Sequence, residues 1–132
     1  MTEKVEFDSN NSERVSKEVS FDVVINDSIL EIVGSKIKFR RIDKGEPVKL
    51  QGVWIMSGSV IDGKTQSRDI SGPIKTMKIL SGKRFQWISY NTETNQVLGA
   101  GGGFYSTTNN EYIENTEFFS TDDSKVRQQI KI

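Results

Sequence analysis

The stretch KLQGVWIMSG, residues 49–58, predicts the strand around which the chain is organised. A loop with glycine and proline punctuation, residues 43–48, precedes it, and the triplet Gly52-Val53-Trp54 starts it. We expect this strand to end at Gly58 or Val60. Alternation of apolar and polar residues, the period of half-buried strands, continues on both sides of it. The sequence therefore predicts an all-β chain.

Turn residues divide the rest of the chain into further short strands. Asn26-Asp27 and Gly34-Ser35 separate three strands before the loop, and Ser81-Gly82 joins two strands after it as a hairpin. Residues 61–72 are polar and weakly patterned, which predicts a long loop with a short helix. The expected strands are residues 19–25, 29–33, 37–41, 74–80, 83–90, 97–105, 111–119 and 124–132. Eight or nine short antiparallel strands with hardly any helical periodicity are typical of a barrel.

Composition excludes several classes of function. The 132 residues suffice for one domain with a single core, and 18 basic residues balance 18 acidic ones, so no net field favours nucleic acid. The chain has no cysteine and no histidine, which removes thiol chemistry and the commonest general base and metal ligand. We expect no cofactor and no metal. No apolar run has the length of a membrane span, and the polar start lacks the apolar core of a signal peptide, so the chain as written is expected to stay in the cytoplasm.

Three stretches together resemble a known family. The Gly52-x-Trp54 triplet, the segment FQWISY at 85–90, and the run LGAGGGFY at 98–105 followed by Tyr112-Ile113-Glu114 are similar to small, uncharacterised lipocalin-like proteins of Bacteroidetes. The resemblance implies an up-and-down antiparallel β-barrel of about eight strands, in a family that is often exported. It also implies that Gly52 and Trp54 close one end of the barrel together with an arginine of the last strand, Arg41 or its neighbour Arg40.

The two ends of the chain carry similar sequences. EFDSNNSERVSKEVSF at 6–21 aligns with EFFSTDDSKVRQQIKI at 117–132, at an offset of 111 positions. Relative to the resembling family, residues 1–45 correspond to the C-terminal strands and residues 49–132 to the N-terminal and central strands. The order predicts one domain, residues 1–132, that is circularly permuted or domain-swapped.

Two arrangements fit this order. Either residues of about 20–119 close one barrel and one copy of the repeated corner is displaced, or the N-terminal strands of one chain complete the barrel of another. Two copies that compete for one position leave an unpaired edge strand in a monomer, which favours a homodimer by strand exchange.

Aromatic side chains on consecutive strands are the candidate ligand-binding residues. They are Phe85, Trp87, Tyr90, Phe104 and Tyr112, with Glu114 as a polar contact. Tyr105 and Phe118, on the same strands, are further aromatic residues that could line a cavity. An eight-stranded barrel has room either to be filled by such side chains or to hold one small hydrophobic ligand, and both outcomes stay open.

Other motifs have plainer interpretations. The glycine run 99–103 lacks the lysine, hydroxyl residue and helix of a phosphate loop, so we expect it to mark a strand bend or a close backbone approach. Glu114 and Glu117 are three residues apart and lie on opposite faces of a regular strand, which disfavours a paired acid-base site unless a bulge intervenes. Asp122-Asp123 is expected to be a solvated turn.

The sequence thus favours a noncatalytic domain that binds a small hydrophobic or amphipathic molecule. The alternative is a structural or protein-interaction module with a filled barrel that oligomerises by strand exchange. An enzyme is a remote third option, because no nucleophile, base and orienting group are recognisable together, and we predict no catalytic residue.

Overall fold

The structure, a computed structural model, describes all 132 residues and confirms that the chain is all-β. Its helical segments are two 3₁₀ turns of three residues, so no helix has the length or apolar character to cross a membrane. The strands form four open sheets and not one closed barrel of eight strands. The elements are β1 (Thr2–Lys4), η1 (Ser12–Arg14), β2 (Glu18–Ser20), β3 (Val23–Ile25), β4 (Ile29–Ile32), β5 (Lys38–Arg40), β6 (Gly52–Ile55), β7 (Gly58–Ile61), β8 (Lys64–Ser67), β9 (Ile74–Leu80), β10 (Arg84–Asn91), β11 (Gln96–Thr108), β12 (Glu111–Phe119), η2 (Asp123–Lys125) and β13 (Gln129–Lys131).

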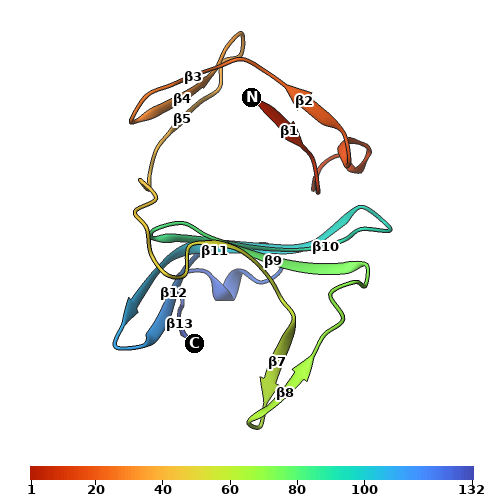
Figure 1. Ribbon diagram of the computed structural model, residues 1–132, viewed down its shortest axis with the longest axis vertical. Coiled ribbons are helices and arrows are strands. Elements are labelled where there is room, and N and C mark those ends of the chain that lie inside the picture. The colour runs from red at the N-terminus through yellow and green to blue at the C-terminus, as the bar shows by residue number, and fades with distance from the viewer.

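The largest sheet has the strand order β13-β12-β11-β10-β9-β6, and all its strands are antiparallel neighbours. The Trp54 strand, β6, is therefore an edge strand that pairs with β9, with Trp54 opposite Lys78. Residues 61–72 contain no helix, which corrects the expectation for this segment. Lys64–Ser67 instead pairs with Gly58–Ile61 as a hairpin, β7–β8, that extends away from the sheet (Figure 1).

Register gives this sheet two different faces. One face, which we call the aromatic face, carries Trp54, Lys78, Leu80, Phe85, Trp87, Tyr105, Tyr112 and Glu114. Leu80, Phe85 and Tyr105 form its buried core, against which Leu50 packs from the preceding loop. The opposite face carries Met77, Ile79, Ile88 and Tyr90 among others.

Strands β1 to β5 form an arch beside the opposite face (Figure 1). The arch touches the sheet where Phe7 packs against Tyr90, with ring centroids 5.3 Å apart. Its β3, β4 and β5 form a separate three-stranded sheet, and β1 pairs only with β2.

The repeated corner is confirmed in atomic detail. Residues 1–21 and 112–132 both fold as strand, 3₁₀ turn and strand, with side-chain caps at Asn11 and Asp122 and positive φ angles at Ser16 and Arg127. The β1–β2 and β12–β13 ladders have the same register after a shift of 111 positions. Backbone hydrogen bonds also recur in pairs: Val5 N to Lys17 O and Thr116 N to Gln128 O, Ser16 N to Val5 O and Arg127 N to Thr116 O, Phe21 N to Met1 O and Ile132 N to Tyr112 O.

The glycine run brings β11 close to its neighbours, as the sequence predicted. A Cβ atom on Gly101 would lie 2.4 Å from the Trp87 Nε1 atom, and one on Gly103 would lie 2.0 Å from the Asn115 carbonyl oxygen. A bulge at Gly102/Gly103 accompanies this contact. These glycines therefore have a structural role, because any side chain there would push apart strands of the sheet.

We predict that Gly103→Ala lowers the free energy of unfolding by about 2–3 kcal/mol, because the added methyl group meets backbone that cannot move without breaking the ladder. Gly72→Ala is the matched control, since its Cβ would meet only the Asp69 carbonyl oxygen at 3.6 Å. Urea denaturation of both variants checks this. Equal stability of the two variants would contradict the close approach.

The linker between arch and sheet is held by Asp43. Its carboxylate accepts hydrogen bonds from the Ser81 hydroxyl at 2.5 Å, the Lys83 amide at 2.7 Å and the Gly45 amide at 2.8 Å. The Ser81 bond, followed by the Gly45 bond, lowers the Asp43 pKa to about 2. We call these contacts the Asp43 clip; they fix the direction in which the arch leaves the β9–β10 turn.

Because the folded-state pKa is depressed, the clip contributes its stability above the ordinary carboxyl pKa of 3.8 and loses it as pH falls through about 2. We expect the Lys83 amide resonance to titrate with a midpoint near 2, and this step to vanish in Asp43→Asn. NMR titration measures it. A midpoint near 3.8 would show that the clip does not form.

Candidate functional site

An open groove of about 630 Å³ lies beside the aromatic face. The loop before β6 forms one wall and the end of the β11–β12 hairpin forms the other. Its apolar lining comes from Val48, Leu50, Tyr105 and Tyr112, and its rim carries amide, hydroxyl and charged side chains such as Asn109, Asn110 and Lys49. The groove therefore combines an aromatic wall with a polar rim.

An ion pair adjoins the aromatic wall. Lys78 on β9 contacts the Glu114 carboxylate on β12, and the Tyr112 hydroxyl donates a 2.6 Å hydrogen bond to the same carboxylate oxygen. The Glu114 side chain is 8% exposed and that of Lys78 is 31% exposed. The Lys78 Nζ atom also lies 5.4 Å from the ring centroid of Phe85 and 5.5 Å from that of Tyr112. The cluster is therefore a cation between two aromatic rings and a carboxylate.

Strand register explains why residues so distant in sequence meet. Glu114 pairs with Tyr105 across the β11–β12 ladder, and Trp87 pairs with Lys78 across the β9–β10 ladder. All four side chains therefore point to one face. The tyrosine rings of Tyr105 and Tyr112 lie 5.4 Å apart at 38°, and Tyr105 donates its hydroxyl to the Ser81 carbonyl at 2.6 Å.

Both tyrosines stay protonated at neutral pH. Burial raises the pKa of Tyr112, and the hydrogen bond to Glu114 together with that negative charge raises it further. Burial also raises the pKa of Tyr105, with a smaller contribution from the charge of Asp43. A tyrosine that keeps its proton acts as a hydrogen-bond donor and not as a base.

The Glu114 carboxylate is already engaged within this cluster. One of its oxygens accepts contacts from both Lys78 and Tyr112, and Glu111, the carboxylate that lines the groove, forms an ion pair with Lys131. No group of three or more acidic side chains is placed to hold a metal ion. Glu117 binds Arg84 instead, and a bulge at this point of β12 separates it from Glu114. The two glutamates therefore serve different contacts.

The predicted ligand-binding residues fall on both faces of the sheet. Phe85, Trp87, Tyr112 and Glu114 share the aromatic face. Tyr90 and Phe104 lie on the opposite face, where Tyr90 contacts the arch and Phe104 is exposed. Alternation assigns residues within one strand to two sides, and only the cross-strand register shows which side each set occupies.

Of the residues expected to close a barrel end, Gly52 and Trp54 lie on the same strand, whereas Arg41 makes no cation–π contact with Trp54. Gly52 and Trp54 lie on β6, and the Trp54 indole donates a 2.9 Å hydrogen bond to the Leu50 carbonyl. Two cation–π contacts are present, both made by Lys78, and Arg41 and Trp54 do not form one. Arg41 and Arg40 line a shallow depression beside Ile79 and Phe118.

Sequence reasoning missed Lys78 and Leu50. Lys78 sits at an inward position of the strand 74–80, between Thr76 and Leu80, and an inward lysine in an amphipathic strand signals an internal ion pair. Leu50 had no local signal, because its role depends on the path of the loop.

No protein-family model matches the chain, and comparisons with curated proteins and with solved structures found no similar protein.

We predict that Tyr112→Phe reduces the loss of stability at alkaline pH. A raised folded-state pKa keeps the stabilising contribution complete below pH 10 and loses it as pH rises beyond that value, because the unfolded tyrosine ionises first. Unfolding measured from pH 8 to pH 11 should show a shallower decline in the variant. Identical slopes in wild type and variant would mean that Tyr112 is not buried against Glu114.

Proposed function

We propose that this protein is a noncatalytic, lipocalin-like domain that binds a small amphipathic molecule in the groove beside the aromatic face. The observation that carries the proposal is the joining of an apolar aromatic wall to a polar rim in one groove of about 630 Å³. Small-molecule sites are typically concave, mostly apolar and equipped with a few polar groups, within a range of about 300–1,000 Å³.

The two parts of the groove suit the two parts of such a ligand. An apolar body would lie against Val48, Leu50 and the rings of Tyr105 and Tyr112. A polar head would reach the amides of Asn109 and Asn110 and the ammonium of Lys49 at the rim. The rim offers hydrogen-bond donors to both anionic and uncharged polar heads. The groove therefore suits amphipathic ligands of either kind.

The ion pair supports a binding role for the wall. Lys78 and Tyr112 both contact one carboxylate oxygen of the buried Glu114, and such linked hydrogen bonds hold their members in a single arrangement. The Tyr112 ring lines the groove while its hydroxyl is engaged by Glu114. A noncatalytic role agrees with this arrangement.

A lipocalin-like architecture accounts for the order of elements. Six strands, β6 and β9 to β13, form an antiparallel up-and-down sheet that begins at the Gly52-Val53-Trp54 strand. An antiparallel sheet of this kind, with one aromatic face, could form part of an up-and-down barrel. In this proposal the aromatic face is the interior of the barrel.

We predict that anilinonaphthalene sulfonate, a dye with an apolar body and an anionic head, binds the wild-type protein saturably at one site per chain. Val48→Asp should weaken this binding about tenfold, because it places a charge on the apolar wall. The matched control is Val60→Asp, an exposed valine on the β7–β8 hairpin away from the groove. Fluorescence titration measures both.

Two outcomes would contradict the proposal. Dye binding that is unsaturable, or equal weakening by Val48→Asp and Val60→Asp, would show that the dye senses exposed apolar surface in general. Absence of binding at millimolar dye would show that the groove does not take an amphipathic molecule of this size.

A further inference from the structure

The single chain leaves an unusual amount of surface uncovered. A compact monomer of 14.9 kDa exposes about 7,000 Å², and this chain exposes 9922 Å². If each chain of a dimer buried this excess of about 2,900 Å², the two chains together would bury about 5,800 Å², which is at the upper end of the range for permanently associated chains. Only 11 of 132 residues are buried, although large apolar side chains are frequent. Such surface indicates a partner.

Part of the uncovered surface is one face of the three-stranded sheet β3–β4–β5. Register places Ile25, Leu30 and Phe39 side by side on this face, and Val23, Ile32 and Ile37 share it by alternation. Ile25 is 63% exposed and Phe39 is 52% exposed. Val24, Glu31 and Lys38 line the other, polar face. This sheet is amphipathic and nothing in the chain covers its apolar side.

The repeated corner indicates where that apolar side belongs. Residue 132 corresponds to Phe21, so a superposition of residues 1–21 on residues 112–132 continues the chain from the C-terminal corner into β3. Ile130 lies opposite Glu114 and so on the aromatic face, and Val19 is its equivalent. Alternation then carries the same face from Val19 to Val23 and Ile25. The apolar side of β3–β4–β5 is therefore turned toward the aromatic face.

We propose that residues 22–42 of a second copy of this chain dock at the β13 end of the six-stranded sheet and cover its aromatic face. Each chain then has one donor segment, residues 22–42, and one acceptor face. The smallest closed assembly is a dimer in which each chain donates its segment to the other. If each chain donates to the next one without closure, a larger oligomer forms.

The Asp43 clip explains why the donor comes from another copy. It holds the arch to the Ser81–Lys83 turn, and the arch leaves this turn on the side of the sheet opposite to the aromatic face (Figure 1). A chain that covered its own aromatic face would break these hydrogen bonds and carry the arch around the sheet edge. A second copy docks with its clip intact.

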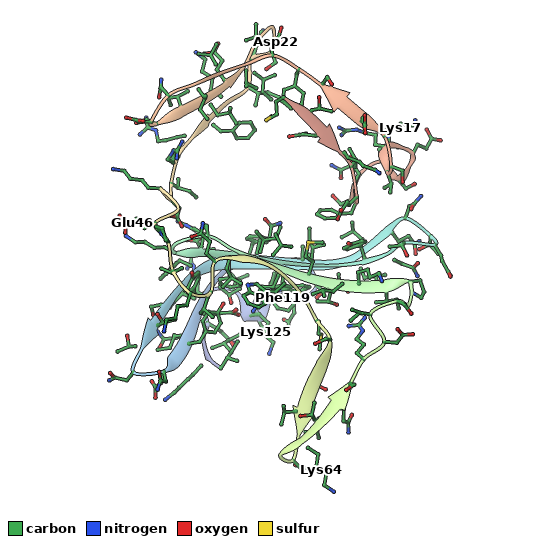
Figure 2. All side chains as sticks on the ribbon, in the orientation of Figure 1. Lys17, Asp22, Glu46, Lys64, Phe119 and Lys125 are labelled. Carbon is green, nitrogen blue, oxygen red and sulfur yellow. The ribbon has the colours of Figure 1, made fainter.

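The hinge for this exchange is the junction of Phe21 and Asp22. These residues lie between β2 and β3, outside any strand, and Figure 2 places Asp22 at the crest of the arch and Lys17 in the N-terminal corner beside it. The acceptor keeps its own residues 112–132, because β12 pairs with β11 along nearly its whole length. The N-terminal corner of the donor therefore bends away at this hinge.

Native mass spectrometry with matched variants tests the proposal. We expect wild type at a multiple of 14.9 kDa, and Ile25→Asp as a monomer because it places a charge in the covered face. Val24→Asp is the control: it is the next residue, 59% exposed, and on the polar face. Urea unfolding of both variants shows that the six-stranded sheet persists. A monomeric wild type, or equal dissociation by both variants, would overturn the proposal.

A spin label distinguishes exchange from self-closure. The chain has no native cysteine, so Lys38→Cys, on the polar face of β5, can be labelled alone. The spin-labelled protein is mixed with protein that carries ¹⁵N-tryptophan and no spin label. The label should then broaden the indole signals of Trp54 and Trp87 in the other chain. Broadening that appears only when label and ¹⁵N share one chain would show that residues 22–42 cover their own sheet. Neither measurement involves the dye, so failure of the proposed ligand binding leaves this result intact.

Discussion

The antiparallel register of β9, β10, β11 and β12 determines which side chains of the large sheet meet. It brings Lys78 and Glu114 together from strands that are 36 positions apart in sequence. A slip of one residue in any of these ladders would move one partner to the opposite face and leave a charge without its counterion. The glycines of β11 fix this register, because only a residue without a side chain lets the Trp87 ring and the Asn115 carbonyl approach its backbone.

The aromatic face forms the wall of the groove and is only partly covered within the chain. Its centre is stabilised internally by Leu80, Phe85 and Tyr105, whereas Trp54 at the β6 edge is half-exposed. A face of this kind is stable in water when a second layer covers it. The two proposals cover different parts of this face. The ligand would occupy the groove at the end of the β11–β12 hairpin, and the second copy would cover the rest of the face.

The two corners show how far local sequence controls local structure. Residues 1–21 and 112–132 differ at many positions, yet both keep a capping side chain, a 3₁₀ turn and a residue in the left-handed region. Their surroundings differ completely, because one corner extends the large sheet and the other pairs with nothing else. Figure 2 shows Lys17 and Lys125, in the two corners, on opposite sides of the sheet. The corner is therefore an independent local unit.

Local sequence patterns are enough to predict the all-β class, most strand positions, the repeated corner and the close approach at the glycine run. These features depend on alternation, turn residues and caps, which act over a few neighbouring residues. The sequence also placed Trp87, Tyr112 and Glu114 among the candidate residues. The strand Lys64–Ser67 escaped prediction because all four of its residues are polar.

Which candidate residues share a face follows from the pairing of strands in three dimensions. The tertiary structure separated Tyr90 and Phe104 from the others, added Lys78 and Leu50, and left the sheets open where a closed barrel was expected. These features result from the pairing between strands, from the path of the loop before β6 and from the direction that the Asp43 clip imposes on the arch. They depend on contacts between residues far apart in the chain, and sequence periodicity carries no information about such contacts.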